Sequence, residues 1–159
     1  MRNCAPLRII PGALSLRQWN LIQLTHMAAA AAAAAARILI VDDDETVLHT
    51  FSKALTLEGF DVRVAQSPLT GLQELDEVRP DAILLDLRMP FVNGIGFLYR
   101  LRANAAYRDI PVAIITGDSC IADSAMQEMH DLDAELVFKP IWIDEVVSVT
   151  RGLLQKRRT

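Results

Sequence analysis

Cysteine is scarce in this chain of 159 residues, because only Cys4 and Cys120 occur. Neither a disulfide framework nor a cysteine metal site is therefore expected. No run of about 18 strongly apolar residues occurs, so no membrane span is predicted. The formal net charge of -4 is small and dispersed, and binding to a nucleic-acid backbone needs a concentrated basic surface, so no direct nucleic-acid partner is expected. These absences favour a single domain in a reducing, cytoplasmic location.

Residues 1–36 lack the features of the rest of the chain. They contain no acidic residue, the first being Asp42, and they end in nine consecutive alanines from Ala28 to Ala36. An acid-poor, arginine-bearing leader is typical of a targeting peptide, but no periodicity links it to later segments. We interpret residues 1–36 as a disordered or spurious leader, with Met27 as an alternative start, and expect the folded domain over residues 37–157.

From Arg37 onward, short apolar runs alternate with amphipathic segments, which predicts an α/β fold with five strands and five helices. Right-handed crossovers then give a doubly wound parallel sheet of five strands, (βα)5, with the flavodoxin-like order 2-1-3-4-5. The strands are expected at 38–41, 60–65, 82–85, 111–115 and 136–138. The helices are expected at 44–59, 67–78, around 97–101, at 118–130 and from 140 onward.

Chemically active side chains follow the apolar runs. Asp42 and Asp43 follow the first strand, Asp86 the third, Thr116 ends the fourth and Lys139 follows the fifth. Each alone has an ordinary structural role as a helix cap, turn former or solvated tip. In a doubly wound sheet, however, the carboxyl ends of the strands meet at the ligand site. The five side chains are therefore predicted to converge.

Such a cluster needs a compensating cation. Two carboxylates about 4 Å apart repel each other by about 4 kcal/mol at an effective dielectric constant near 20. Mg²⁺ or Mn²⁺ would offset this repulsion, since oxygen ligands and phosphate oxygens suit such ions. Asp86 would then be a carboxylate nucleophile that forms an aspartyl phosphate. Lys139 would supply a positive charge, and Thr116 a hydroxyl donor, for the phosphoryl oxygens.

Four stretches resemble the response-regulator receiver family: RILIVDDDE, PDAILLDLRMPFVNG, VAIITGD and LVFKP, in this order. The resemblance covers residues 37 to about 157. It implies that Asp86 is the phosphorylated residue and a metal ligand, that Asp43 is a direct ligand and that Asp42 acts mainly through water. The backbone carbonyl of Arg88 would be a third ligand.

The resemblance also implies a function. The domain would accept a phosphoryl group from a sensor histidine kinase or a histidine phosphotransfer protein, Thr116 would move toward the phosphate, and Lys139 would contact it. The chain would catalyse only its own phosphorylation and dephosphorylation, so it is not expected to be an enzyme with a released product. Because the sequence stops soon after the fifth helix, we expect a stand-alone receiver with an unknown downstream protein target. A phosphorylation-dependent dimer is left open.

Four positions depart from the family pattern or add to it. Leu136 stands where the family commonly has an aromatic residue that turns inward, which questions the usual coupling to the switch hydroxyl. Phe138 is expected in the core rather than as a substitute switch. Arg88 and Asp118 each follow a site residue by two positions, and we expect their side chains over the pocket mouth, where they affect how fast water reaches the acyl phosphate.

Two alternatives are weighed against this interpretation. The stretch ILIVDDDET also fits haloacid-dehalogenase-like phosphatases, with Asp42 as nucleophile and Asp44 as acid/base. In that family the lysine precedes the last acidic motif, whereas Lys139 follows Asp118, and Asp86 is left without a role. The second alternative is a degenerate receiver that binds partners without being phosphorylated.

Overall fold

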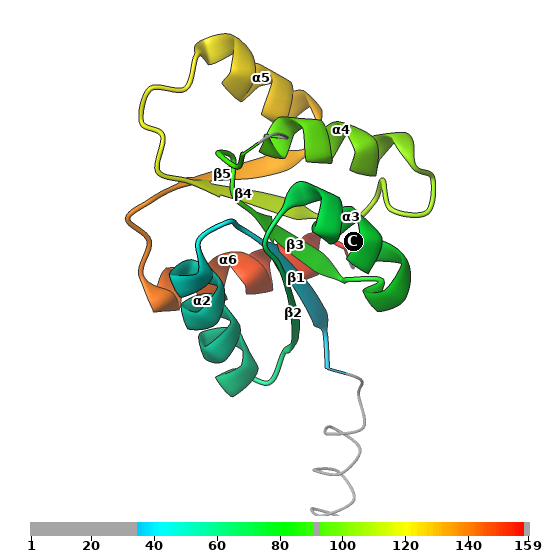
Figure 1. Cartoon of the computed structure of the whole chain (residues 1–159), viewed down its shortest axis with the longest axis vertical. Helices are drawn as coiled ribbons and strands as arrows, with labels where there is room; N and C mark the ends of the chain where they lie inside the picture. Colours follow the sequence, from blue (N-terminus) through cyan, green and yellow to red (C-terminus); the bar gives the residue numbers. More distant parts are fainter. Residues whose placement is uncertain (1–34, 91–92, 158–159) are drawn as a thin grey trace, which may run out of the picture. The chain divides into compact units, whose positions relative to one another are not determined.

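The computed structural model describes residues 35–90 and 93–157, so nearly all of the expected leader lies outside the described residues. In the described part, five strands alternate with five helices in one parallel sheet (Figure 1). The sheet order is β2-β1-β3-β4-β5, which confirms the predicted topology. The elements are β1 (Arg37–Val41), α2 (Glu45–Leu57), β2 (Asp61–Ala65), α3 (Pro68–Val78), β3 (Ala82–Leu85), α4 (Gly94–Ala103), β4 (Val112–Thr116), α5 (Asp123–Asp131), β5 (Ala134–Phe138) and α6 (Ile143–Lys156).

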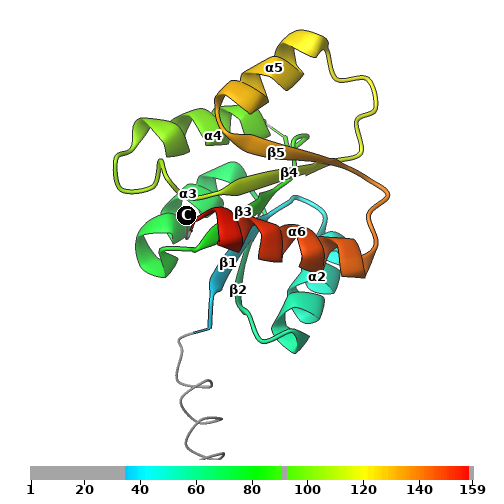
Figure 2. The same ribbon diagram turned by 180° about the vertical axis from the view of Figure 1, so that it is seen from behind.

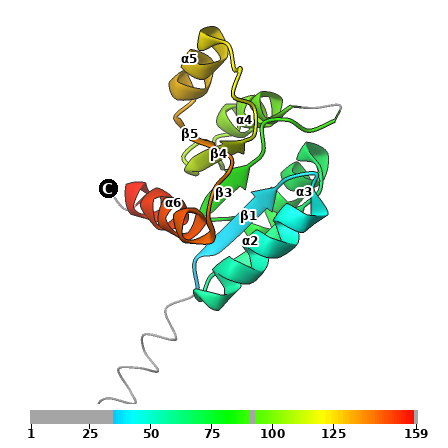
Figure 3. The same cartoon turned by 90° about the vertical axis from the view of Figure 1, so that its left-hand side faces the viewer.

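The helices cover both faces of the sheet. Figure 1 shows α3 and α4 in front of the strands, whereas Figure 2, from behind, shows α6 in front. Helices α2 and α6 lie next to each other on their face (Figure 3). Within β1, Leu39 and Val41 belong to one buried cluster, and Ile38 and Ile40 to the other. Burial on both faces explains why the central strands are continuous apolar runs instead of alternating ones.

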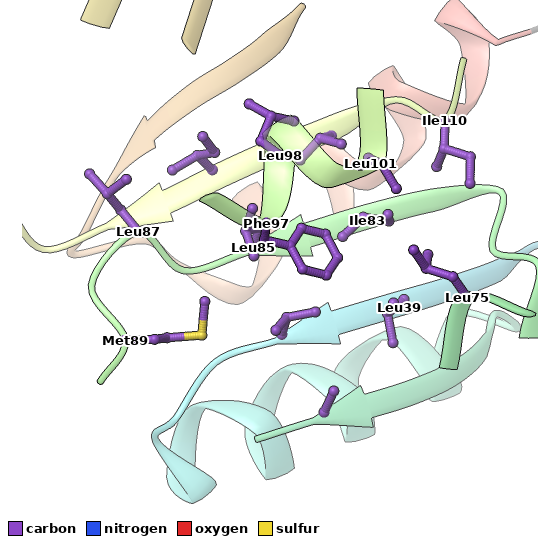
Figure 4. Packing of buried hydrophobic residues seen from close by; sticks show 14 of the residues in the cluster. Leu39, Leu75, Ile83, Leu85, Leu87, Met89, Phe97, Leu98, Leu101 and Ile110 are labelled. Carbon is purple, nitrogen blue, oxygen red and sulfur yellow. The ribbon is translucent and has the colours of Figure 1, made fainter. Parts of the chain in front are cut away.

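The core beneath α3 and α4 extends into the loop that follows β3. Phe97, Leu98 and Leu101 of α4 are fully buried against the sheet (Figure 4). Leu87 and Met89, both in the loop beyond the end of β3, are buried in the same cluster. The loop that begins at the predicted acceptor residue is therefore anchored by apolar side chains on the inner side.

Local capping accounts for several helix boundaries. The Asp44 carboxylate accepts hydrogen bonds from the amides of Thr46 at 2.8 Å and Val47 at 3.3 Å, so α2 begins where the sequence indicates. These bonds hold the pKa of Asp44 below its ordinary value. Gly59 has a φ of 88°, a left-handed conformation that suits glycine and lets the chain leave α2 toward β2.

Two helices begin later than predicted. Helix α5 starts at Asp123 instead of Asp118, because the Asp118 carboxylate accepts the Cys120 amide at 2.9 Å and forms a turn there. Helix α6 starts at Ile143 instead of Pro140. The Lys139–Pro140 peptide bond is cis. Strand β5 begins at Ala134, two residues before the prediction.

Two apolar residues, one at the end of β5 and one at the start of α6, are more exposed than predicted. The expectation that Phe138 lies in the core is wrong, since 47% of its surface is exposed. Strand β5 is an edge strand that pairs only with β4, and its residues are only partly covered. Ile143 is 39% exposed at the first turn of α6, whereas Val146, Val147 and Leu153 of that helix are buried as expected.

None of the described helices is long and apolar enough to cross a membrane.

Candidate functional site

A cleft of about 450 Å³ lies at the carboxyl ends of the strands. Because β1 has β2 on one side and β3 on the other, the strand order reverses beside it, the place where doubly wound sheets hold ligands. The lining is predominantly polar and comes from the loops after β1, β3, β4 and β5. The lining residues are Asp42, Asp43, Asp44, Asp86, Arg88, Gly117, Asp118, Ser119 and Lys139.

Lys139 joins two buried carboxylates in this cleft. Its Nζ lies 3.0 Å from Oδ2 of Asp42 and 2.9 Å from Oδ1 of Asp86. The two aspartates are only 4% and 7% exposed. Their other oxygens also accept hydrogen bonds, from the amide of Asp44 at 2.9 Å and from the amide of Arg88 at 2.7 Å. Both carboxylates are thus held in one orientation, as buried charges require.

The same contacts set the protonation of the site. Burial raises the pKa of Asp86, and the nearby charge of Asp42 adds to this, while the hydrogen bond and charge of Lys139 oppose it. Burial alone would lower the pKa of Lys139. The hydrogen bonds and charges of Asp86 and Asp42 outweigh that effect, so the pKa of Lys139 is above its ordinary value. Lys139 therefore carries its positive charge at neutral pH.

Asp43 and Thr116 are placed differently from the three residues in direct contact. Asp43 is exposed and lines the cleft. Thr116 is fully buried, and its hydroxyl oxygen accepts the amide of Asp118 at 3.1 Å. Its carbonyl accepts the Lys139 amide at 2.7 Å. Thr116 is therefore linked to the cleft through the backbone amides of Asp118 and Lys139, two residues that line it. The predicted role of its hydroxyl stays a prediction.

The donor set suits a hard divalent cation. The acidic side chains that line the cleft offer carboxylate oxygens as ligands. Two of them, Asp42 and Asp86, already bind one positive charge, the Lys139 ammonium. Over residues 35–90 and 93–157, no three His, Cys, Asp or Glu side chains form a ready-made metal cage. Mg²⁺ does not need one, since it commonly uses one or two carboxylates and keeps several waters. The residues present fit such an ion.

Arg88 and Asp118 form an ion pair at the rim of the cleft. The Arg88 guanidinium donates from Nη2 at 2.5 Å and from Nε at 2.9 Å to Oδ2 of Asp118. The Cys120 amide, and then Arg88, hold the pKa of Asp118 below its ordinary value. Both side chains line the cleft, where the sequence spacing predicted them. Gly117 and Ser119, which sequence reasoning did not single out, also line it, and their position directly after Thr116 is the signal that could have indicated them.

Leu136 lies in β5 and is half-buried against the core under α3 to α5. An aliphatic side chain therefore packs where the family pattern predicts an aromatic one. Phe138 is the exposed aromatic residue of the strand.

Comparison with known proteins gives the family. Residues 38–151 match the response regulator receiver domain. The transcriptional regulatory protein PrrA of Mycobacterium leprae (strain TN) is 36% identical over 111 residues, which cover 70% of this chain and 46% of PrrA. Response regulator MprA of Mycobacterium sp. (strain KMS) is 32% identical over 113 residues, which cover 69% of this chain and 46% of MprA. The chain thus spans less than half the length of these relatives.

The fold is similar to that of the chemotaxis protein CheY4 of Vibrio cholerae, with a TM-score of 0.70 at 24% identity over 76% of this chain and 100% of that one. The family match displaces the haloacid-dehalogenase-like alternative, and Asp44, assigned there as acid/base, is engaged in capping α2. With its doubly wound sheet, its acidic cleft beyond β1 and β3 and its match over residues 38–151, the chain belongs to the response-regulator receiver family of two-component signalling.

Proposed function

We propose that this domain, over residues 37–157, accepts a phosphoryl group on the Asp86 carboxylate from the phosphohistidine of a sensor histidine kinase or a histidine phosphotransfer protein. The observation that carries the proposal is the Lys139 ammonium, within 3.0 Å of two nearly buried carboxylates at the mouth of a polar cleft. Phosphoryl transfer depends on positioning and on neutralising charge, and this arrangement provides both.

The transfer is a substitution at phosphorus. A carboxylate oxygen of Asp86 forms the new bond to phosphorus while the bond from phosphorus to the histidine nitrogen breaks. Lys139 would shift its hydrogen bond from the carboxylate to a phosphoryl oxygen, which keeps the positive charge beside the added negative charge. Asp86, Asp43 and the carbonyl of Arg88 would hold Mg²⁺ or Mn²⁺, with Asp42 acting mainly through water. When bound, the ion neutralises the phosphoryl oxygens.

Phosphorylation would then switch partner binding. The added anion would draw the Thr116 hydroxyl away from the Asp118 amide and shift the loop after β4. The surfaces next to this loop belong to α5, β5 and α6. Leu136 would repack there in the role that an aromatic residue commonly has. We place this switch in the cytoplasm, where histidine-kinase signalling reaches its receivers.

The range of candidate downstream targets is wider than the composition alone suggests. The dispersed charge disfavoured direct contact with nucleic acid, yet PrrA is named a transcriptional regulatory protein. DNA therefore joins a protein partner as a candidate target of the pathway. The described residues form a receiver domain, and its surfaces on α5, β5 and α6 would pass the phosphorylation signal to either kind of target.

Mass-spectrometric mapping after incubation with Mg²⁺ and acetyl phosphate tests the proposal. One phosphoryl group on Asp86 is expected, lost in Asp86→Asn and retained in Asp61→Asn, which changes an exposed aspartate of β2. Modification at another residue would contradict the acceptor assignment. No modification at any concentration of acetyl phosphate, with beryllofluoride also failing to bind, would favour the degenerate receiver.

A further inference from the structure

Gly94, the first residue of α4, lies against the backbone of the predicted acceptor. A Cβ atom added to Gly94 would be 2.5 Å from the carbonyl oxygen of Asp86 and 3.0 Å from the Cα of Leu87. The Gly94 amide also donates to the Leu87 carbonyl at 2.9 Å. The start of α4 therefore approaches the acceptor peptide more closely than any residue with a side chain could.

The peptide that Gly94 touches has little freedom to move away. The Asp86 amide donates to the Val41 carbonyl in β1 at 2.8 Å. Leu87 and Met89 are buried in the core beneath α4 (Figure 4). A displacement of the Asp86 carbonyl would therefore be passed to the Asp86 side chain and its bonds, since tightly packed interiors transmit strain.

We propose that Gly94 is a positioning residue for phosphoryl acceptance. Because Gly94 has no side chain, the first turn of α4 packs directly against the Asp86 peptide. This packing orients the Asp86 carboxylate toward Lys139 and fixes the backbone from Asp86 to Arg88. This inference rests on the proposed function. It adds a residue that touches no substrate and acts only through the backbone of the acceptor.

Other glycines offer matched controls. A Cβ on Gly71 would meet only side chains, Val41 at 3.0 Å and Phe97 at 3.1 Å, so Gly71→Ala overpacks the core without touching the acceptor peptide. A Cβ on Gly152 would have no heavy atom within 4 Å. The backbone of Gly94 lies outside the left-handed region, and alanine favours helices, so Gly94→Ala tests the close approach rather than the conformational freedom of glycine.

The experiment compares rates of Asp86 phosphorylation by acetyl phosphate in the full chain. Gly94→Ala is expected to lower the maximal rate about 10- to 100-fold, the scale of an ångström-sized misplacement, with little change in half-saturating acetyl phosphate. Gly152→Ala should match the wild type. Gly71→Ala should lose stability but retain the rate per folded molecule. Without metal or donor, the NMR signal of the Asp86 carboxyl carbon should shift in Gly94→Ala and not in Gly71→Ala.

Two outcomes separate this inference from the proposed function. If the wild type is not phosphorylated on Asp86, the proposed function fails. If the wild type is phosphorylated, and Gly94→Ala stays within about twofold of its rate with an unshifted carboxyl signal, the inference is wrong.

A variant that adds no atoms covers the case in which Gly94→Ala does not fold. Asn93→Ala removes the side chain that accepts the Gly96 amide at 2.9 Å, which loosens the first turn of α4. A several-fold slower reaction is expected, and an unchanged rate per folded molecule would overturn the inference.

Discussion

The guanidinium of Arg88 lies 2.5 Å from the carboxylate of Asp118, and this ion pair ties the loop after β3 to the loop after β4 at the rim of the polar cleft. The arginine side chain is 72% exposed, whereas that of the aspartate is 14% exposed. A pair of this kind adds little to stability because water and salt screen it. Its position favours a kinetic role in the proposed reaction, where the pair would shield the acyl phosphate of Asp86 from water.

Removing the arginine side chain should therefore shorten the lifetime of the phosphorylated state. For Arg88→Ala, we expect the half-life of phospho-Asp86 to fall by about threefold, which equals about 0.6 kcal/mol of barrier. The backbone carbonyl at position 88 is retained. Loss of label from purified phosphoprotein measures the half-life, with Arg63→Ala on exposed β2 as control. An unchanged half-life in Arg88→Ala would end this interpretation.

Lys139→Met should destabilise the fold in a pH-dependent way, because it leaves Asp42 and Asp86 buried without their shared cation. We expect a loss of about 2 kcal/mol at neutral pH, less than for a fully buried pair because Lys139 is partly exposed. Denaturant unfolding measures it, and Lys53→Met on the exposed side of α2 should change little.

The pH dependence of that loss has a defined sign. The folded-state pKa of Asp86 is already raised by burial, and losing Lys139 raises it further. A carboxyl with a raised pKa binds its proton more tightly in the folded state, so the folded state gains stability as the pH falls through that pKa. The deficit of Lys139→Met should therefore shrink in acid. A deficit that is constant from neutral pH to about pH 4 would contradict this account.

Arg102 connects three segments at the opposite end of the sheet. Its half-buried guanidinium donates to four backbone carbonyls at 2.7 to 3.1 Å, in the segment after α4 and in the turn between α5 and β5. The acceptors are the carbonyls of Arg108, Ile110, Leu132 and Asp133. Burial holds the pKa of Arg102 below its ordinary value, although it stays charged.

Arg102→Ala should cost about 3 kcal/mol of unfolding free energy, since it leaves two partly buried carbonyls and two exposed ones without their donor. Arg100→Ala, two residues earlier on the exposed side of α4, should cost less than about 0.5 kcal/mol. Urea unfolding of both variants gives the comparison. Equal losses would show that the four hydrogen bonds are not the source of the stability.

The two tyrosines of the chain should ionise at unusually high pH. Tyr99 of α4 donates to the Glu128 carboxylate of α5, and Tyr107 donates to the Asp76 carboxylate of α3. These hydrogen bonds raise the pKa of both phenols. The folded state then holds the phenol protons more tightly than the unfolded state, so the folded state loses stability as the pH rises above about 10.

Ultraviolet titration of tyrosinate measures this effect. Glu128→Gln should return the pKa of Tyr99 toward its ordinary value and leave that of Tyr107 raised. The same titration of Tyr107→Phe isolates Tyr99. A normal alkaline titration of both phenols in the wild type would contradict these two hydrogen bonds.

Local pattern predicted most of the elements and their order. Apolar runs such as 82–85 are buried on both faces, and this double burial can be recognised without coordinates. Asp44 and Ser67 cap α2 and α3 because capping is a contact between residues two or three apart. The start of α5 was missed because the Asp118 carboxylate makes its own turn with the Cys120 amide. The start of α6 was also placed too early, at Pro140 instead of Ile143.

The sequence alone determined that an acidic pair, a further aspartate, a threonine and a lysine stand at the ends of four strands. Parallel strands bring their carboxyl ends to one edge of a sheet, so the sequence also predicted that these residues converge. Only the tertiary structure decided how they meet. Lys139 contacts Asp42 and Asp86 across 97 and 53 residues of sequence, Phe138 is exposed at the edge strand, and Gly94 lies where a Cβ would collide with the Asp86 carbonyl. Such contacts depend on the distance between elements packed in three dimensions, which residue spacing along the chain does not encode.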